Sequence, residues 1–329
     1  MVLYILMSVT PNLTWFDLPK CSAHPLPILA LGWDLTTSFR AGTAEAPLHM
    51  LAVSHQVDVH HPWFGTAVVD RGIQSIPTPE RVTTYQRMYA PAARAYMTEW
   101  HGLDNSPAAD DLNAACEAVH AAIANTVSAN YTTCMGVVGG EHSITAGVVA
   151  GIAQHRTQFG ILQVDAHMDC RDAYQGLQHS HASVMRRCAG VSAVDTVVQV
   201  GIRDYCLDEV AFANDQGFHT WFDWDLQTAL FEGQSWQSLC QRMVDPLPEQ
   251  VYITVDVDGL EPGFVPDTGT PVPGGLHYPH VTYLIQQVVA SGRQIIGFDC
   301  VEAAGAATST GIINATQLLY FLCGAACHR

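Results

Sequence analysis

Asp165, His167 and Asp169 alternate along the stretch DAHMD, directly after the apolar run FGILQV. On an extended chain, residues two apart project from the same face. The alternation therefore places two carboxylates and one imidazole side by side. A solvated strand edge, an Asp-rich turn and a salt-bridged loop are the ordinary alternatives, so the rest of the chain has to decide.

Acidic residues or histidines also follow three more apolar runs. The residues that follow them are Glu141 and His142 after CMGVV, Asp256 and Asp258 after VYITV, and Asp299 and Glu302 after QIIGF. Each cluster alone is most often a solvated turn or a loop beside a helix cap. If they converged at one sheet edge, the carboxylates would repel one another and raise one another's pKa values unless a cation neutralised them.

Four carboxylates and two imidazoles form a mixed oxygen and nitrogen donor set without a thiolate, which suits Mn²⁺ better than structural zinc. The six candidate ligands are His142, Asp165, His167, Asp169, Asp256 and Asp258. Six ligands, some of them bridging, are enough for two ions and too many for one ion that also leaves a position for water. Because a pair of ions activates water near neutral pH, these residues predict metal-assisted hydrolysis.

Such clusters require elements that bring strand ends together. From about residue 108 onward, short apolar runs alternate with helical patterns, for example a helix over 110–127, a strand over 134–138 and a helix over 143–155 that Ser143 would cap. This alternation predicts an α/β fold with a mostly parallel sheet and helices on both faces. Ligands then bind at the carboxyl ends of the strands. The first hundred residues are less regular.

Four segments together resemble the signatures of the ureohydrolases, the family of arginase and agmatinase. They are GGEHS (139–143), DAHMDCRD (165–172), VDVDGLEPGFVPDTGTPVPGG (255–275) and GFDCVE (297–302). The resemblance spans roughly residues 30 to 302. It implies a three-layer α/β/α sandwich, two Mn²⁺ ions and urea as a product, and with the chain length it favours one domain over residues 1–329.

By position, the resemblance also implies how the ligands are shared. One ion would take His142 and Asp169, the other His167 and Asp258, and the bridging pair would be Asp165 and Asp256. These assignments rest on the match to the family's motifs.

Three catalytic roles follow from the resemblance. Asp169 would hand a proton to the departing amine, and Glu302 would hold the guanidinium by charge-assisted hydrogen bonds. His181 in HSHAS would move protons, with His179 as a competing candidate. The ordinary alternatives are a helix-capping role for His181 and a salt-bridged strand end for Glu302.

The loop DCRDAYQGLQHSHASVMRR resembles those of agmatinases and aminopropylagmatine hydrolases more than that of arginase. It therefore implies that agmatine is cleaved to putrescine and urea. Guanidinobutyrate, guanidinopropionate, arginine, aminopropylagmatine and guanidine are alternative substrates. A two-metal phosphoesterase would need basic residues beside the metals, and the strand-end loops are nearly free of Lys. A catalytically silent metal-binding relative acting as a regulatory partner would lose a ligand, whereas all six are present.

The net charge of −17 disfavours nucleic acid and anionic membranes as partners and favours a cationic guanidino substrate or a metal ion. Ten cysteines are spread singly, which is typical of a reducing compartment and indicates a cytoplasmic protein. The apolar start lacks a basic segment and a cleavage site, and Met7 is a second candidate start. No run reaches the roughly 18 apolar residues of a membrane span. The resemblance implies a homo-oligomer, a trimer or a hexamer.

Overall fold

The computed structural model describes residues 14–18, 23–99 and 107–328. The two candidate starts, Met1 and Met7, and one of the ten cysteines, Cys21, lie outside the described residues. Eight strands form one sheet, and every hydrogen-bonded pair of strands in it is parallel. The strands are β1 (Leu26–Leu31), β2 (Ile73–Ile76), β3 (Met135–Gly139), β4 (Phe159–Val164), β5 (Val194–Ile202), β6 (His219–Phe222), β7 (Gln250–Asp256) and β8 (Gln294–Val301). Their order across the sheet is β2-β1-β3-β8-β7-β4-β5-β6.

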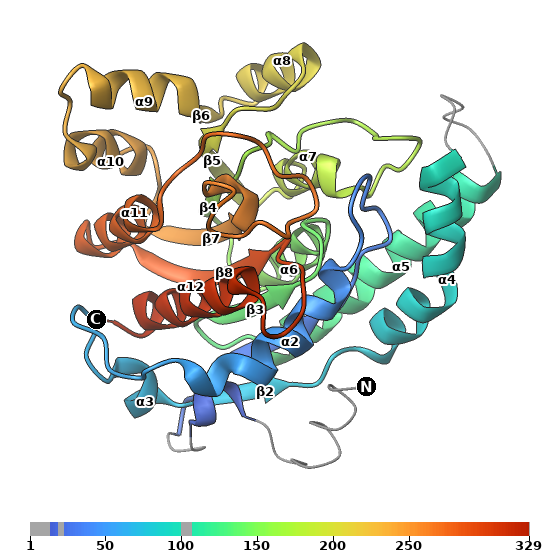
Figure 1. Cartoon of the computed structure of the whole chain (residues 1–329), viewed down its shortest axis with the longest axis horizontal. Helices are drawn as coiled ribbons and strands as arrows, with labels where there is room; N and C mark the ends of the chain where they lie inside the picture. Colours follow the sequence, from blue (N-terminus) through green and yellow to red (C-terminus); the bar gives the residue numbers. More distant parts are fainter. Residues whose placement is uncertain (1–13, 19–22, 100–106, 329) are drawn as a thin grey trace.

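Helices cover both faces of this sheet (Figure 1). One layer contains α2 (Ala46–Val53), α3 (Ala67–Arg71), α9 (Asp223–Phe231), α10 (Trp236–Val244), α11 (Tyr278–Ala290) and α12 (Thr310–Cys327). The other contains α4 (Glu80–Glu99), α5 (Pro107–Asn130), α6 (Ile144–Ile152), α7 (Val184–Ala189) and α8 (Leu207–Asp215). The predicted three-layer α/β/α sandwich is confirmed.

Two hydrophobic cores separate the layers, one on each face of the sheet. Successive residues of a strand enter opposite cores: Ile28 belongs to the core under α12, and Leu29 belongs to the core under α5. Ile161 and Leu162 of β4 divide in the same way. Burial on both faces explains why these strands appear in the sequence as continuous apolar runs.

The predicted elements after residue 108 are confirmed, and the less regular first hundred residues contain the strand β1 and the helix α2. Ser143 precedes α6, but its hydroxyl donates to Glu141 Oε1 instead of capping the helix. The edge strands β2 and β6 were not predicted because they are short and partly exposed. The long helix α4 was also missed. The prediction of one domain over residues 1–329 stays a prediction.

α12 corrects one expectation, because it is 18 residues long and apolar enough by length and composition to cross a membrane. However, 67% of it is buried within the protein. It packs against β8, α2 and α11 as a core helix. A buried core helix passes the same test of length and hydropathy, so α12 is weak evidence for a membrane span.

The centre of the sheet decides where the polar clusters meet. β3, β8, β7 and β4 are neighbours in that order, and all four run in the same direction. Their carboxyl ends therefore lie side by side. The long loop after β7 is tied down there by Arg203, whose guanidinium donates to the carbonyl oxygens of Asp258, Leu260 and Val272.

Candidate active site

The six predicted metal ligands meet at the carboxyl ends of β3, β4 and β7. In the described part of the chain, two groups of side chains could hold a metal ion, with their ligand atoms within 4.8 Å of one another. The first group is His142, Asp165 and Asp169, and the second is Asp165, His167 and Asp258. Asp165 belongs to both groups, which is the position expected of a bridging ligand.

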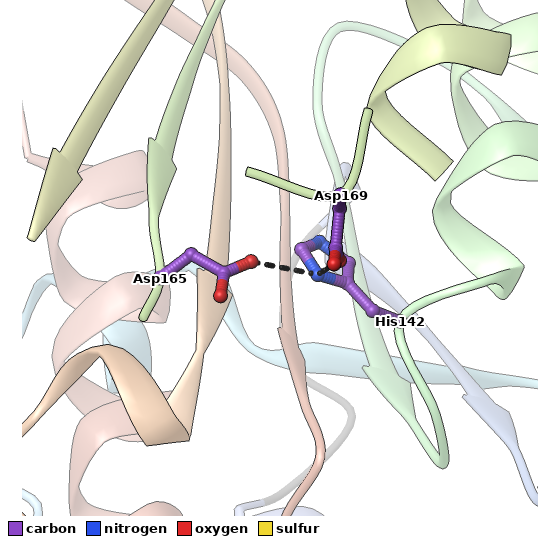
Figure 2. Close-up of side chains that lie close together, drawn as sticks. All are labelled: His142, Asp165 and Asp169. Atoms are coloured by element: carbon purple, nitrogen blue, oxygen red, sulfur yellow. Dashed lines mark ion pairs between the residues drawn. The ribbon is translucent and has the colours of Figure 1, made fainter. Parts of the chain in front are cut away.

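Figure 2 shows the first group, in which the carboxylates of Asp165 and Asp169 both approach the ring of His142. The His142 Nδ1 atom lies 3.1 Å from an oxygen of each carboxylate. Asp256 belongs to neither group, but its Oδ2 atom is 3.4 Å from the same nitrogen. In the second group, His167 Nδ1 lies 3.2 Å from Asp258 Oδ2 and 3.6 Å from Asp165 Oδ1.

Hydrogen bonds from backbone N–H groups orient three of the carboxylates. Asp165 accepts from the backbone N–H of His167 at 2.7 Å, so the strand-end turn itself orients the carboxylate. Asp256 accepts from the backbone N–H of Asp258 at 2.9 Å in the same way. Asp258 in turn accepts from the backbone N–H of Ala166 at 3.1 Å, which links the ends of β7 and β4. The i, i+2 spacing therefore lets each first Asp be held by the backbone two residues later.

Two site residues have a backbone conformation that non-glycine residues rarely adopt. Asp169 has φ of 55° and Glu302 has φ of 64°. Such strain persists only where the surroundings impose it, and it concentrates at functional sites. Glu302 is held from both ends, because its backbone N–H donates to Gly140 at 2.7 Å and its Oε1 accepts from the backbone N–H of His142 at 2.8 Å.

The tautomer of His142 tests whether the site fits a metal ion. The Thr254 hydroxyl donates its one proton to Asp299 Oδ1 at 2.6 Å, so it must accept from His142 Nε2–H at 2.8 Å. In the neutral ring, Nδ1 then carries a lone pair. This buried atom makes no hydrogen bond, although three carboxylates surround it. Burial opposes a charge on this ring, but the three carboxylates raise the pKa of His142 well above its usual range. They therefore favour positive charge at Nδ1, either a proton or a bound cation, and these residues fit a metal ion.

The pKa values of the site carboxylates in the absence of a cation also indicate that the site fits a metal ion. Burial raises the pKa of Asp169 to about 7, and the charge of Asp165 adds to this effect. Burial and neighbouring carboxylates raise the pKa of Asp256 well above its usual range. Burial opposes the charged form of Asp165 too, but His142 and His167 outweigh it and lower the pKa of this carboxyl. Crowded carboxylates therefore resist ionisation together unless positive charge is supplied.

A cavity of about 410 Å³ opens onto this cluster. Its charged and titratable lining residues include Arg40, His167, Asp169, Arg171, His181 and Asp204. The volume lies in the range of pockets for small molecules. Asp256, Asp258 and Glu302 are buried and do not line the open cavity. We call the strand-end ligands the floor, although only His167 and Asp169 line the open cavity and the other ligands lie buried beneath them, and we call the surrounding loop residues the wall.

The arginase family model matches residues 25–323. This chain belongs to the arginase family. The N(1)-aminopropylagmatine ureohydrolase of Synechocystis sp. (strain ATCC 27184 / PCC 6803 / Kazusa) is 27% identical over 279 residues, which cover 84% of this chain and 80% of the relative. The agmatinase of Pyrococcus horikoshii is 33% identical over 189 residues, which cover 57% of this chain and 61% of the relative.

Among solved structures, proclavaminate amidino hydrolase from Streptomyces clavuligerus is similar to this chain with a TM-score of 0.75 at 20% identity, covering 96% of this chain and 97% of that one. This likeness concerns the fold. The predicted ureohydrolase family and the prediction that the chain is an enzyme are confirmed. The phosphoesterase and silent-relative alternatives are therefore set aside.

The two candidate shuttle histidines of this ureohydrolase lie in different places. His181 lines the cavity beside His167 and Asp169, whereas His179 does not. The ring of His179 packs against His120 of α5, with ring centroids 5.2 Å apart. Burial lowers the pKa of His181 to about 3, assisted by the charges of His167 and His142, so the ring is neutral at neutral pH. The location favours His181, and its role stays a prediction.

Glu141 and Asp299 follow apolar runs in the sequence, but no role was predicted for them. Both are buried acceptors of hydroxyl hydrogen bonds. Asp299 accepts from Tyr252, Thr254 and Thr145 at 2.6 to 2.7 Å. Its position at the end of β8 was the available signal, but its link to His142 through Thr254 joins residues 112 positions apart.

Glu141 accepts from both the backbone N–H and the hydroxyl of Thr36, at 2.9 and 2.7 Å. The Thr36 hydroxyl in turn accepts from the backbone N–H of His181 at 2.9 Å. Glu141 therefore connects the loop after β1 to the cavity wall. The nine cysteines that the structure describes are all free, and Cys170 directs its thiol to the carbonyl oxygen of Met168.

Proposed function

We propose that this ureohydrolase is a binuclear-manganese enzyme that hydrolyses a guanidino compound to urea and an amine, with agmatine as its first candidate substrate. The observation that carries the proposal is the pair of donor groups that share Asp165 at the floor of the cavity. Four carboxylates and two imidazoles suit Mn²⁺ by their donor types. When bound, two such ions lower the pKa of water so that it can attack at neutral pH.

Two protein groups would act on the guanidinium directly. The resemblance gives Glu302 this role: its Oε1 accepts from the backbone N–H of His142, and its Oε2 could form charge-assisted hydrogen bonds to a guanidinium that reaches below the open cavity. Asp169 lines the cavity and lies between His142 and the open space, where it can pass a proton to the departing amine. His181 lies in the cavity wall near Asp169, and the resemblance gives it the role of moving protons during hydrolysis.

Agmatine carries an amine at the end opposite its guanidinium. Asp204 lines the cavity and its side chain is 68% exposed, so it offers a carboxylate to that amine. The names of two similar relatives, agmatinase and N(1)-aminopropylagmatine ureohydrolase, also support a substrate with a cationic tail.

One observation favours a second candidate, a guanidino acid such as guanidinobutyrate. Arg171 and Arg40 also line the cavity, and a guanidinium recognises a carboxylate well. Arg171 lies 3.7 Å from Glu209 and stacks over the Tyr174 ring at 4.8 Å, so its direction is already set. The wall thus offers the Asp204 carboxylate and the two guanidinium groups to the distal end of a substrate.

The test is urea release by the Mn²⁺-loaded protein from agmatine, aminopropylagmatine, arginine, guanidinobutyrate, guanidinopropionate and guanidine, with bound manganese measured in parallel. Agmatine hydrolysis that falls in Asp204→Asn and survives in Arg171→Gln would support the first candidate. The reverse pattern with guanidinobutyrate would support the second. Absence of urea from all six compounds with two bound ions would contradict the proposed function.

We also propose that the protein works in the cytoplasm as a homo-oligomer, a trimer or a hexamer, without nucleic-acid or membrane partners. The excess of acidic over basic residues supports the last point, because phosphate-bearing surfaces attract Lys and Arg. Light scattering on the purified protein measures the oligomeric state directly.

A further inference from the structure

The wall of the cavity depends on a short segment, residues 171–180, that joins the strand-end cluster to His181. Arg171 and Tyr174 of this segment line the cavity together with His181. Apart from the turn within it, the segment belongs to no helix or strand, so the sheet that fixes the floor does not fix this wall. Other contacts must hold it in place.

A tight turn shapes the middle of this segment. Tyr174 and Leu177 exchange both backbone hydrogen bonds, at 3.0 and 2.9 Å. The two residues between them have positive φ, 50° at Gln175 and 78° at Gly176. A two-residue turn of this kind needs left-handed backbone at both positions, which glycine adopts easily and glutamine does not. The strained Gln175 requires support from outside the turn.

Asn113 of α5 supplies this support. Its side-chain amide donates from Nδ2 to the carbonyl oxygen of Gly176 at 2.9 Å, and its Oδ1 accepts from the backbone N–H of Gln178 at 2.8 Å. Because a carbonyl can only accept and an N–H can only donate, the two bonds together determine the orientation of the amide. One side chain therefore joins both sides of the turn to α5.

Tyr96 of α4 adds a third contact. Its hydroxyl donates to the carbonyl oxygen of Gln175 at 2.8 Å. On the other side of the turn, Leu177 is fully buried in the core that lies under α5. The Arg187 guanidinium also donates to the carbonyl oxygen of Gln178 at 2.9 Å. These four polar contacts and one apolar anchor hold the four consecutive positions 175–178 of the segment.

We infer that Asn113 is a positioning residue for substrate binding: by holding the turn at residues 174–177 on α5, it sets the part of the cavity wall formed by Arg171 and Tyr174. The inference rests on the proposed function, because it assumes that this wall contacts the substrate. Asn113 itself does not line the cavity. It is half-buried, and the packing of α5 is made by its apolar neighbours, for example Leu112 and Cys116.

The test compares Asn113→Ala with Asn125→Ala, which makes the same substitution at an exposed position of the same helix. Both changes affect helix propensity equally, and only the first releases the turn. We expect Asn113→Ala to raise KM for the best substrate about tenfold, because a misplaced wall weakens binding, with a smaller change in kcat. Manganese content should not change. Hydrogen exchange should become faster in residues 172–179.

Tyr96→Phe removes a single hydroxyl from the same turn and should shift KM and exchange in the same direction by less. If Asn113→Ala lowers Tm but leaves KM and the exchange of residues 172–179 at the values of Asn125→Ala, the inference is wrong. If the unmodified protein releases no urea from any guanidino compound, the proposed function fails. The exchange comparison then still decides whether Asn113 holds the turn, since it does not depend on turnover.

Discussion

The floor and the wall of the cavity are built in different ways. At the floor, Asp165, Asp256 and Asp258 follow the ends of parallel strands and are aimed by backbone N–H groups. At the wall, Arg171 and Asp204 lie on loops and are partly exposed. Backbone that belongs to a sheet is fixed by many hydrogen bonds, whereas a loop depends on a few side-chain contacts. Under the proposed function, the floor would hold the metal ions, and the wall would contact the distal end of the substrate.

The largest expected effect comes from a substitution at the floor, the loss of the shared ligand Asp165. Asp165→Asn removes the carboxylate shared by both donor groups, and we expect it to abolish manganese loading and urea release together. Metal analysis and a urea assay check this, with the exposed Asp195→Asn as control. A variant that kept full activity would overturn the metal assignment.

The second effect compares His181, which lines the cavity, with His179, which does not. His181→Asn should lower kcat by roughly 100-fold with little change in KM, because it removes a proton-transfer group. Added imidazole should restore part of the lost rate. His179→Asn, whose ring packs on His120 away from the cavity, should stay close to the unmodified rate. An equal loss in both variants would contradict the assignment to His181.

The third effect concerns the support beneath the floor. Thr254→Val keeps the shape of the side chain but leaves His142 Nε2–H without an acceptor. We expect manganese affinity to fall by about 10- to 100-fold, since groups that orient a ligand imidazole have effects of this size. Titration with Mn²⁺ measures it, and the exposed Thr228→Val is the matched control. Unchanged affinity would mean that Thr254 does not set the tautomer.

The smallest effect concerns stability rather than catalysis. Burial lowers the pKa of His120 to about 3, with a smaller contribution from His179, so the unfolded chain binds a proton below its pKa of 6.5 that the folded chain does not. Stability from this group is present above pH 6.5 and is lost as the pH falls toward 3. When the pH falls from 7 to 5, the free energy of unfolding should decrease by about 2 kcal/mol less in His120→Leu than in the unmodified protein.

Urea unfolding at the two pH values tests this, with the exposed His55→Leu as control. Equal losses in the unmodified protein and in His120→Leu would show that His120 is protonated without cost in the folded state. Activity at neutral pH should be little changed, because His120 lies outside the cavity lining.

Local patterns were sufficient for most of the fold. The central strands were predicted because burial on both faces makes them continuous apolar runs, and α5 was predicted from helical spacing. β2 and β6 lie at the two edges of the sheet and are partly exposed, so they have no such run. α4 has only two fully buried residues, Val82 and Ala93, which leaves little periodicity to recognise.

The candidate ligands could be predicted from the sequence because each lies at or just after the end of an apolar strand, where a polar residue is easily recognised. The residues that orient His142 and the cavity wall could not be predicted. Thr254 and Asn113 are unremarkable within a strand and a helix, and their partners lie 112 and 63 to 65 positions away. No local rule connects positions that far apart.

By itself, the sequence determined the candidate donor set, because residue types and the two-residue spacing at strand ends specify which donor atoms share one face. Only the tertiary structure decided which of these groups meet, since convergence depends on the order β3-β8-β7-β4 across the sheet. It also separated His181 from His179, two residues apart in the chain, by turning one into the cavity and the other toward α5. Packing of the loop against distant helices makes that choice.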